Sequence, residues 1–146
     1  MNNNLKIHHL GAVVQDMDRT LAFYCDVLGA ELLWDTQTAQ AGDQWDTIYG
    51  FTGTKVRTAG VRLHGVMVEF FNFTYPKVAN DRGSTDFSTI GWKHIAFEVT
   101  DIEQEVERLK AGNVPLVFPI QTLPDGVRIV YFTDPDGLTL EYIQPA

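Results

Sequence analysis

Apolar and polar positions follow the same order twice along this chain. Segments 9–16 and 94–101 share, in register, a histidine, an aliphatic residue, a small residue, a valine and a final aspartate. After each aspartate, apolar residues recur at helical spacing, which predicts helices over 17–28 and 102–111. Such self-similarity indicates two copies of one supersecondary unit.

Extended segments follow each predicted helix, with apolar residues that alternate or run together over strand-like lengths. Segment 74–91 is rich in Asn, Gly, Ser, Thr and Asp without periodicity, which predicts a connector. The expected fold is therefore one α+β domain over 1–146, with βαβββ modules near 5–73 and 92–144. The predicted strands after the helices are 30–34, 56–63 and 66–73 in the first half, and 115–118, 127–132 and 138–143 in the second.

Residues typical of chain reversals flank these predicted elements. Asp16 and Asp101 stand where helix N-caps are expected. Gly29 and Gly112 stand where a left-handed residue would end each helix. The sequence Asp-Pro-Asp-Gly at 134–137 predicts a type I turn between the last two strands.

Four side chains recur on one face of the two modules. Strand alternation directs His9 and His94 away from the predicted helices, and Glu69 and Glu141, in the last strand of each module, share that side. A carboxylate among apolar residues is costly unless a cation compensates it. Two imidazoles and two carboxylates suit one divalent metal ion and leave Zn²⁺, Ni²⁺, Co²⁺, Mn²⁺ and Fe²⁺ open.

A purely structural role for these residues is the alternative. A lone strand histidine is more often an ordinary core or surface residue than a ligand, and Glu69 or Glu141 could pair with Arg62 or Arg128. The coincidence of residue type, face and module position, occurring twice, favours the metal site.

Composition narrows the classes of partner. The 146 residues include 11 Lys and Arg against 19 Asp and Glu, a net charge of −8, so neither nucleic acid nor an anionic membrane is expected as a partner. A single cysteine, Cys25, excludes an intrachain disulfide. Without a long apolar run, and with polar residues after Met1, neither a membrane span nor a signal peptide is expected. We expect a soluble, cytoplasmic protein.

At these positions the chain resembles the vicinal oxygen chelate superfamily, which includes glyoxalases, bleomycin-resistance proteins and extradiol dioxygenases. The resemblance spans nearly the whole chain and is most specific in Phe-Tyr-x-x-x-Leu-Gly at 23–29 combined with the Asp-Pro-Asp-Gly turn. It implies the glyoxalase fold, in which paired βαβββ modules form a cupped, partly closed mixed sheet that holds one divalent ion, and it implies a homodimer. The family's ligand positions fall on His9, Glu69, His94 and Glu141.

The residue at position 69 narrows the activity that this resemblance implies. Extradiol dioxygenases use two histidines and one glutamate, and bleomycin-type binding proteins typically lack the metal set, so Glu69 favours the four-ligand isomerase and lyase branch. Glyoxalase I proteins typically carry arginine where Val13 stands, and methylmalonyl-CoA epimerases usually carry glutamine where Glu69 stands. Neither subfamily matches at every position.

We therefore expect a divalent-metal-dependent isomerase or lyase of glyoxalase type, similar to lactoylglutathione lyase. It would abstract a proton next to a carbonyl of a small, metal-chelated substrate, with Glu141 or Glu69 as the base and Glu141 preferred. A methylmalonyl-CoA epimerase-like enzyme, an extradiol-type dioxygenase and a non-catalytic antibiotic-binding protein remain alternatives.

Residues near these four positions carry weaker signals. Glu98 shares the face of His94 and is a candidate either for orienting a ligand or for an ordinary rim carboxylate. Alternation directs His8 to the face opposite His9, which makes it the poorer ligand. Segment 37–51 looks irregular and is expected to cover the site as a lid that contacts the substrate.

Overall fold

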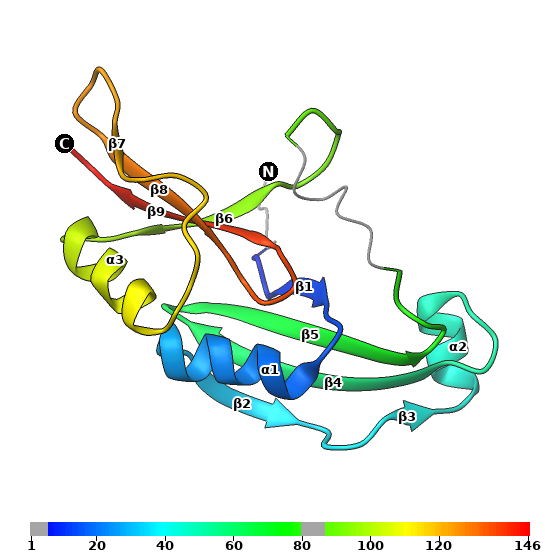
Figure 1. The fold of residues 1–146 in the computed structure, drawn as a ribbon. Helices are drawn as coiled ribbons and strands as arrows, with labels where there is room; N and C mark the ends of the chain where they lie inside the picture. The colour runs from blue at the N-terminus through cyan, green and yellow to red at the C-terminus, as the bar shows by residue number, and fades with distance from the viewer. Residues whose placement is uncertain (1–5, 80–86) are drawn as a thin grey trace. The chain divides into compact units, whose positions relative to one another are not determined.

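Two units make up the chain, and each is built on its own mixed β-sheet, so the fold is α+β as predicted (Figure 1). The computed structural model describes residues 6–79 and 87–146. Unit 1 is Met1–Ala79 and unit 2 is Asn80–Ala146. Residue 5, at the predicted start of module 1, and residues 80–86 of the predicted connector lie outside the described residues. No helix in the described ranges is long and apolar enough to cross a membrane.

Unit 1 has the strand order β1-β5-β4-β2, with the short β3 also pairing with β4. Strand β1 runs parallel to β5, and the other pairings are antiparallel. One face of the sheet is covered by α1, and α2 lies at the end of β4 and β5 (Figure 1). The elements are β1 (Leu10–Val13), α1 (Met17–Ala22), a π-helical segment η1 (Phe23–Val27), β2 (Glu31–Asp35), β3 (Gln40–Ala41), α2 (Asp43–Tyr49), β4 (Lys55–Leu63) and β5 (Val66–Tyr75).

Unit 2 repeats this plan with the strand order β6-β9-β8-β7. Its first strand again runs parallel to its last strand, which is antiparallel to its neighbour. The elements are β6 (His94–Glu98), α3 (Ile102–Ala111), β7 (Gln121–Thr122), β8 (Arg128–Thr133) and β9 (Thr139–Gln144). The predicted repeat of a strand, a helix and an antiparallel strand pair is confirmed.

Each unit buries its core between the helix and the aliphatic face of the sheet. In unit 1, the rings of Tyr24 and Phe70 pack with centroids 4.7 Å apart, and both side chains are buried. In unit 2, α3 buries Ile102, Val106 and Leu109, which recur at helical spacing. The opposite sheet faces, which carry the histidines and glutamates, are therefore free of α1 and α3.

The predicted caps and the predicted turn are present. Asp16 accepts a hydrogen bond from the Arg19 backbone N–H, and Asp101 accepts one from the Gln104 backbone N–H, both at 3.0 Å. Both aspartates therefore satisfy an N–H group that the first turn of the helix leaves unpaired. Asp134 accepts the Gly137 N–H at its carbonyl, which closes the predicted turn.

One helix end differs from the prediction. Gly29 has the expected left-handed conformation, with φ +73°. Gly112 does not: its φ is −82°, and Asn113, with φ +56°, takes the left-handed position instead. Asparagine tolerates this region better than most residues, so the reversal moved one residue along the chain.

Two further predictions, a strand over 115–118 and an irregular segment over 37–51, are wrong. The predicted strand 115–118 is reduced to a single bridge between Leu116 and Phe132, because Pro115 and Pro119 lack the N–H groups that a ladder needs. Segment 37–51 is not irregular, because it contains β3 and α2.

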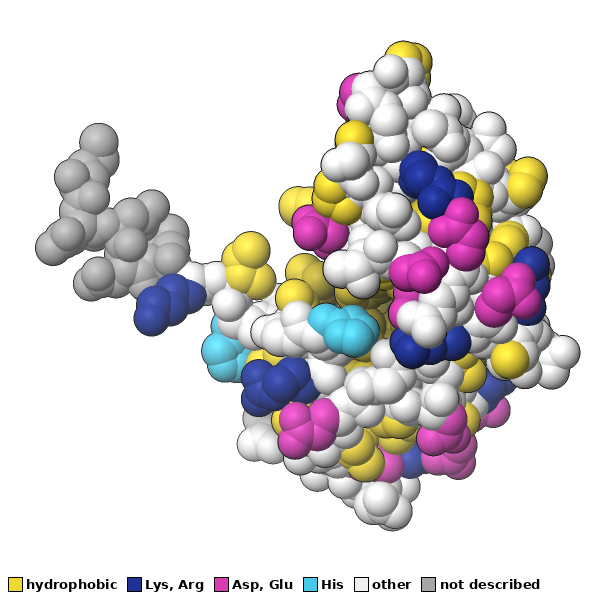
Figure 2. All heavy atoms as spheres, turned by 90° about the vertical axis from the view of Figure 1, so that its left-hand side faces the viewer, with side chains coloured by type: hydrophobic (Ala, Val, Ile, Leu, Met, Phe, Trp, Pro, Cys, Tyr) yellow, Lys and Arg dark blue, Asp and Glu magenta, His cyan; other side chains and the backbone are white. Residues whose placement is uncertain are grey.

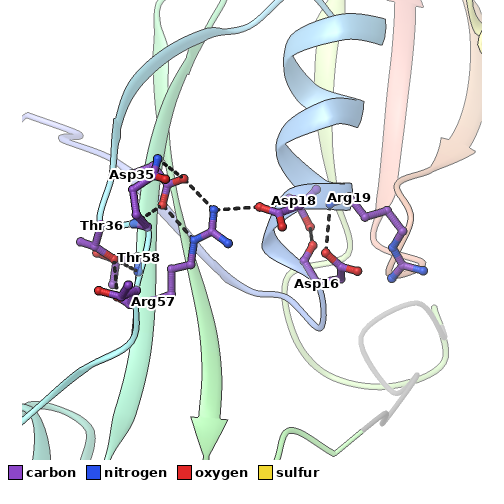
Figure 3. Close-up of polar contacts among 10 residues, drawn as sticks. Asp16, Asp18, Arg19, Asp35, Thr36, Arg57 and Thr58 are labelled. Carbon is purple, nitrogen blue, oxygen red and sulfur yellow. Dashed lines mark hydrogen bonds and ion pairs between the residues drawn. The ribbon is translucent and has the colours of Figure 1, made fainter.

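A cluster of charged side chains ties α1 to the sheet of unit 1 (Figure 3). Arg57 on β4 donates two hydrogen bonds, at 2.9 and 2.7 Å, to Asp35 on β2, and a third, at 2.8 Å, to Asp18 on α1. The hydrogen bonds from Arg57 hold the pKa of Asp35 below its ordinary value. Such a bidentate pair fixes geometry as well as charge.

Candidate metal site

The first histidine–glutamate pair lies on the helix-free face of unit 1. Glu69 on β5 lies opposite Gly11 of β1 in the parallel register, and His9 precedes Gly11 by two residues. His9 lies one residue before β1, and its side chain reaches the side of the sheet that carries Glu69. His9 Nε2 lies 3.2 Å from Glu69 Oε2, and both side chains are partly exposed.

The second pair repeats this arrangement in unit 2. Glu141 on β9 lies opposite Ala96 of β6, and His94 again precedes the opposite residue by two positions. His94 Nε2 lies 2.9 Å from Glu141 Oε2, and the Glu141 side chain is only 9% exposed. The structure thus brings together His9 with Glu69, and His94 with Glu141, from the same register position of each unit.

The donor types in both pairs suit a divalent ion. Imidazole nitrogen and carboxylate oxygen are the ligands that zinc and related first-row metals take in proteins, and in each unit the two donor atoms face each other. Within the described part of either unit, no group of three or more His, Cys, Asp or Glu side chains is arranged so that it could hold a metal ion. Each unit therefore offers two ligands on its own.

The proposed salt-bridge alternative for the two site glutamates does not hold. Arg62 pairs with Glu31 at 3.7 Å, and Arg128 pairs with Glu103. On the face drawn in Figure 2, several Lys and Arg side chains likewise lie next to Asp or Glu side chains. The two arginines that could have explained the glutamates are paired elsewhere.

Of the two residues that neighbour the pairs, His8 lies differently from its expected place, whereas Glu98 agrees with the rim alternative. His8 does not turn away from His9: their Nδ1 atoms are 2.8 Å apart, close enough for one ring to donate to the other. The alternation argument fails there because β1 begins only at Leu10. Glu98 is the last residue of β6 and is exposed.

Aromatic rings surround the histidine of unit 2. The ring of His94 lies 5.1 Å from Tyr131 and 6.0 Å from Phe87, and Phe118 packs on Tyr131 at 5.0 Å. Tyr131 stands directly opposite Glu141 in the β8–β9 ladder. Burial, with a smaller effect of the Glu141 charge, raises the pKa of Tyr131. Next to His94, a pocket of about 480 Å³ is lined by Gly91, Trp92, Lys93 and His94.

Helix α2 supplies the corresponding aromatic residue in unit 1. Its Tyr49 packs edge-on against Phe71 at 5.7 Å and Phe73 at 5.0 Å, both on β5. Burial, with a smaller effect of the Glu69 charge, raises the pKa of Tyr49. Sequence reasoning missed the helix and so missed this contact. In both units the charge of the site glutamate contributes to the raised pKa of a tyrosine.

Known proteins resemble this chain both in sequence and in fold. A family model of the Glyoxalase/Bleomycin resistance protein/Dioxygenase superfamily matches residues 6–142. A 2-epi-5-epi-valiolone epimerase from Actinomyces sp is 32% identical over 94% of this chain and 78% of that protein. Lactoylglutathione lyase GLX1 of Arabidopsis thaliana is 30% identical over 97% of this chain, which spans 45% of that protein. The crystal structure of a glyoxalase family protein from Bacillus cereus matches 98% of this chain and 95% of its own, with a TM-score of 0.84 and 20% identity.

Proposed function

This chain belongs to the Glyoxalase/Bleomycin resistance protein/Dioxygenase superfamily, and from that premise we propose that it is a divalent-metal-dependent isomerase or lyase acting next to a carbonyl of a small substrate. The observation that carries the proposal is the pair of histidine–glutamate contacts, each at the same register position of its unit. The named relatives, an epimerase and a lyase, support this branch of the superfamily over the dioxygenases and the binding proteins.

His9, Glu69, His94 and Glu141 would hold the ion, which we take to be Zn²⁺, Ni²⁺, Co²⁺, Mn²⁺ or Fe²⁺. When bound, such an ion supplies Lewis acidity to a substrate carbonyl and so acidifies the adjacent C–H. A carboxylate held close to that carbon can then take the proton.

Glu141 is the preferred base in this proposal. Its buried carboxylate is held by His94 and faces Tyr131 across the ladder, so its oxygen atoms stay in a defined position. A base that is already oriented toward the C–H bond raises the rate of proton transfer, because the entropy cost of orienting it is not paid during the reaction. Glu141 would accept the proton and return it to the same or the neighbouring carbon. Glu69, with a side chain 23% exposed, is the second candidate.

We also propose a cytoplasmic homodimer. Ile90 and Trp92 are almost fully exposed, and Phe87 and Val13 are about half exposed, Val13 on the edge strand β1. Exposed apolar side chains and an open sheet edge are features that association covers. Sedimentation equilibrium at micromolar concentration should give twice the mass of one chain, and a single-chain mass would contradict the dimer.

Deuterium exchange tests the proposed chemistry directly. Metal-loaded protein is mixed in D₂O with dihydroxyacetone or with the hemithioacetal of methylglyoxal and glutathione, and proton NMR follows the C–H signal next to the carbonyl. Exchange should be faster than in buffer and should fall about 100-fold or more in Glu141→Gln, while Glu107→Gln, an exposed glutamate on α3, should leave it unchanged. Oxygen uptake without proton exchange would instead indicate a dioxygenase.

A further inference from the structure

We propose that Trp34 is a specificity-determining residue of this site: with Phe71 it forms an aromatic wall around Glu69 that selects substrates with a planar, unsaturated part. The inference rests on the proposed function, because it names the substrate class of the same site. It is carried by residues of unit 1 alone, namely Trp34 on β2, Phe71 and Glu69 on β5, and the two glycines opposite Glu69.

Both residues that lie opposite Glu69 in the sheet are glycines. Gly11 faces it from β1 and Gly60 faces it from β4. An aromatic ring lies where each side chain would be: a Cβ at Gly60 would come within 2.0 Å of two ring carbons of Trp34, and a Cβ at Gly11 within 3.0 Å of a ring carbon of Phe71. Glu69 therefore stands between two rings that lie directly against neighbouring strands.

A β-bulge directs Trp34 to this face. Leu32 pairs with Val61, yet Trp34 pairs with Gly60, so two residues of β2 advance against one residue of β4. Without the extra residue, Leu32 and Trp34 would share the aliphatic side on which Val61 is buried. Bulges commonly redirect a side chain in this way. The indole of Trp34 thus reaches the Glu69 face only because the ladder shifts there.

The charged cluster of Figure 3 holds that register. After the bulge, Asp35 pairs with Ala59 and so shares the α1 side of the sheet with Arg57. The bidentate Arg57–Asp35 hydrogen bonds, and the third bond to Asp18 on α1, fix β2 next to the residue that carries the indole. Because the hydrogen bonds fix Asp35, they also fix the backbone of the adjacent Trp34, and its side chain is preorganised for binding.

The wall continues beyond Phe71 through Tyr49, whose ring packs on Phe71 and stacks on Trp45. In the described part of unit 2 the residues opposite Glu141 are Ala96 and Tyr131, so the pair of glycines with rings packed over them does not recur there. Flat aromatic faces bind planar groups by offset stacking and by excluding water from a large area. We therefore assign the planar part of the substrate to unit 1, beside Glu69 and His9, the two residues of this unit that would hold the ion.

Two probes that differ only in their apolar part test this assignment. Benzoylformate and pyruvate carry the same α-keto carboxylate, with a phenyl ring in one and a methyl group in the other. Titration calorimetry on Zn²⁺-loaded protein should show benzoylformate binding at least about tenfold more tightly, about 1.4 kcal/mol, and quenching tryptophan fluorescence. In Trp34→Leu the ratio of the two Kd values should fall to about 2 or less.

A second variant and a control complete the test. Gly60→Ala should lower the ratio as well, because its methyl group displaces the indole, while Leu32→Ala, on the other face of the same strand, should keep the wild-type ratio. A wild-type ratio near one, no measurable benzoylformate binding, or an unchanged ratio in Trp34→Leu would overturn the proposal. Failure of the proposed function appears differently, as pyruvate binding that does not depend on the metal, and the Kd ratio still tests the wall in that case.

Discussion

Replacing Arg57 by methionine should destabilise unit 1 strongly, because it leaves a buried carboxylate without its partner. Methionine keeps much of the length of the side chain and its apolar packing but removes the guanidinium. Asp35, whose side chain is 6% exposed, would lose both of its hydrogen bonds from Arg57, and Asp18 would lose one.

The size of the effect follows from the burial of each partner. Removing one member of a buried ion pair costs about 3–5 kcal/mol. The Arg57 side chain is 17% exposed, so water screens part of the charge, and Asp18 is 81% exposed and adds little. We therefore expect a loss of about 2–3 kcal/mol in the free energy of unfolding.

Urea unfolding at pH 7, followed by circular dichroism, measures this loss. With a slope of about 2 kcal/mol per molar urea, the midpoint should fall by about 1–1.5 M. The control is Arg62→Met, which removes an exposed arginine whose nearest Glu31 oxygen is 3.7 Å away, and it should cost less than about 1 kcal/mol.

The pH dependence gives a second test of the same pair. Arg57 lowers the folded-state pKa of Asp35 below its ordinary value of 3.8. The ionised carboxylate therefore stabilises the fold above about pH 4, and this contribution is lost as the pH falls through the lowered pKa. The stability difference between wild type and Asp35→Asn should be larger at pH 7 than at pH 3. Equal losses in Arg57→Met and Arg62→Met would refute the reasoning.

Three further substitutions test the local structure. Asp101→Ala removes the N-cap hydrogen bond of α3 and should lower the free energy of unfolding, measured in urea, by about 1 kcal/mol. An unchanged free energy of unfolding would contradict a stabilising role of this cap. Gly29→Ala places a side chain at φ +73°, so thermal unfolding should show a loss of about 1 kcal/mol although nothing lies within 4 Å of the new methyl group. Tyr142→Phe should remove the phenol that ionises near pH 12 in an ultraviolet absorbance titration, because burial raises the pKa of Tyr142 to about 12; loss of a phenol that titrates near pH 10 would contradict this.

The histidine–glutamate pair of unit 2 could be predicted because both residues lie within regular strands, where side chains alternate strictly between the two faces. To predict this pair, it was enough to assign His94 and Glu141 each to a strand and to one face of the sheet. The parallel pairing of β6 with β9 then brings the two side chains to 2.9 Å from each other. Helix α3 was equally accessible, since its buried residues recur at helical spacing and Asp101 caps it. These features depend on neighbours along the chain or on a single pairing.

Other features depend on contacts between residues far apart in the sequence, which the local pattern does not predict. The bulge before Trp34 is set by pairing with Gly60 and by the distant Arg57, so a regular strand over 30–34 was the simplest expectation. Helix α2 has seven residues and no side-chain cap at Gly42, which leaves little local signal. The fit of an indole against a glycine becomes visible only when the register of the sheet is known.

Metal content tests the central proposal most directly. Protein purified without tags or chelators is analysed for divalent metals, before and after reconstitution, beside a His94→Ala variant. We predict about one ion per chain in the wild type and a clear loss in the variant, because metal affinity depends on every ligand. Wild-type protein that holds no divalent metal after reconstitution, or a variant that holds as much as the wild type, would contradict a metal site formed by His9, Glu69, His94 and Glu141.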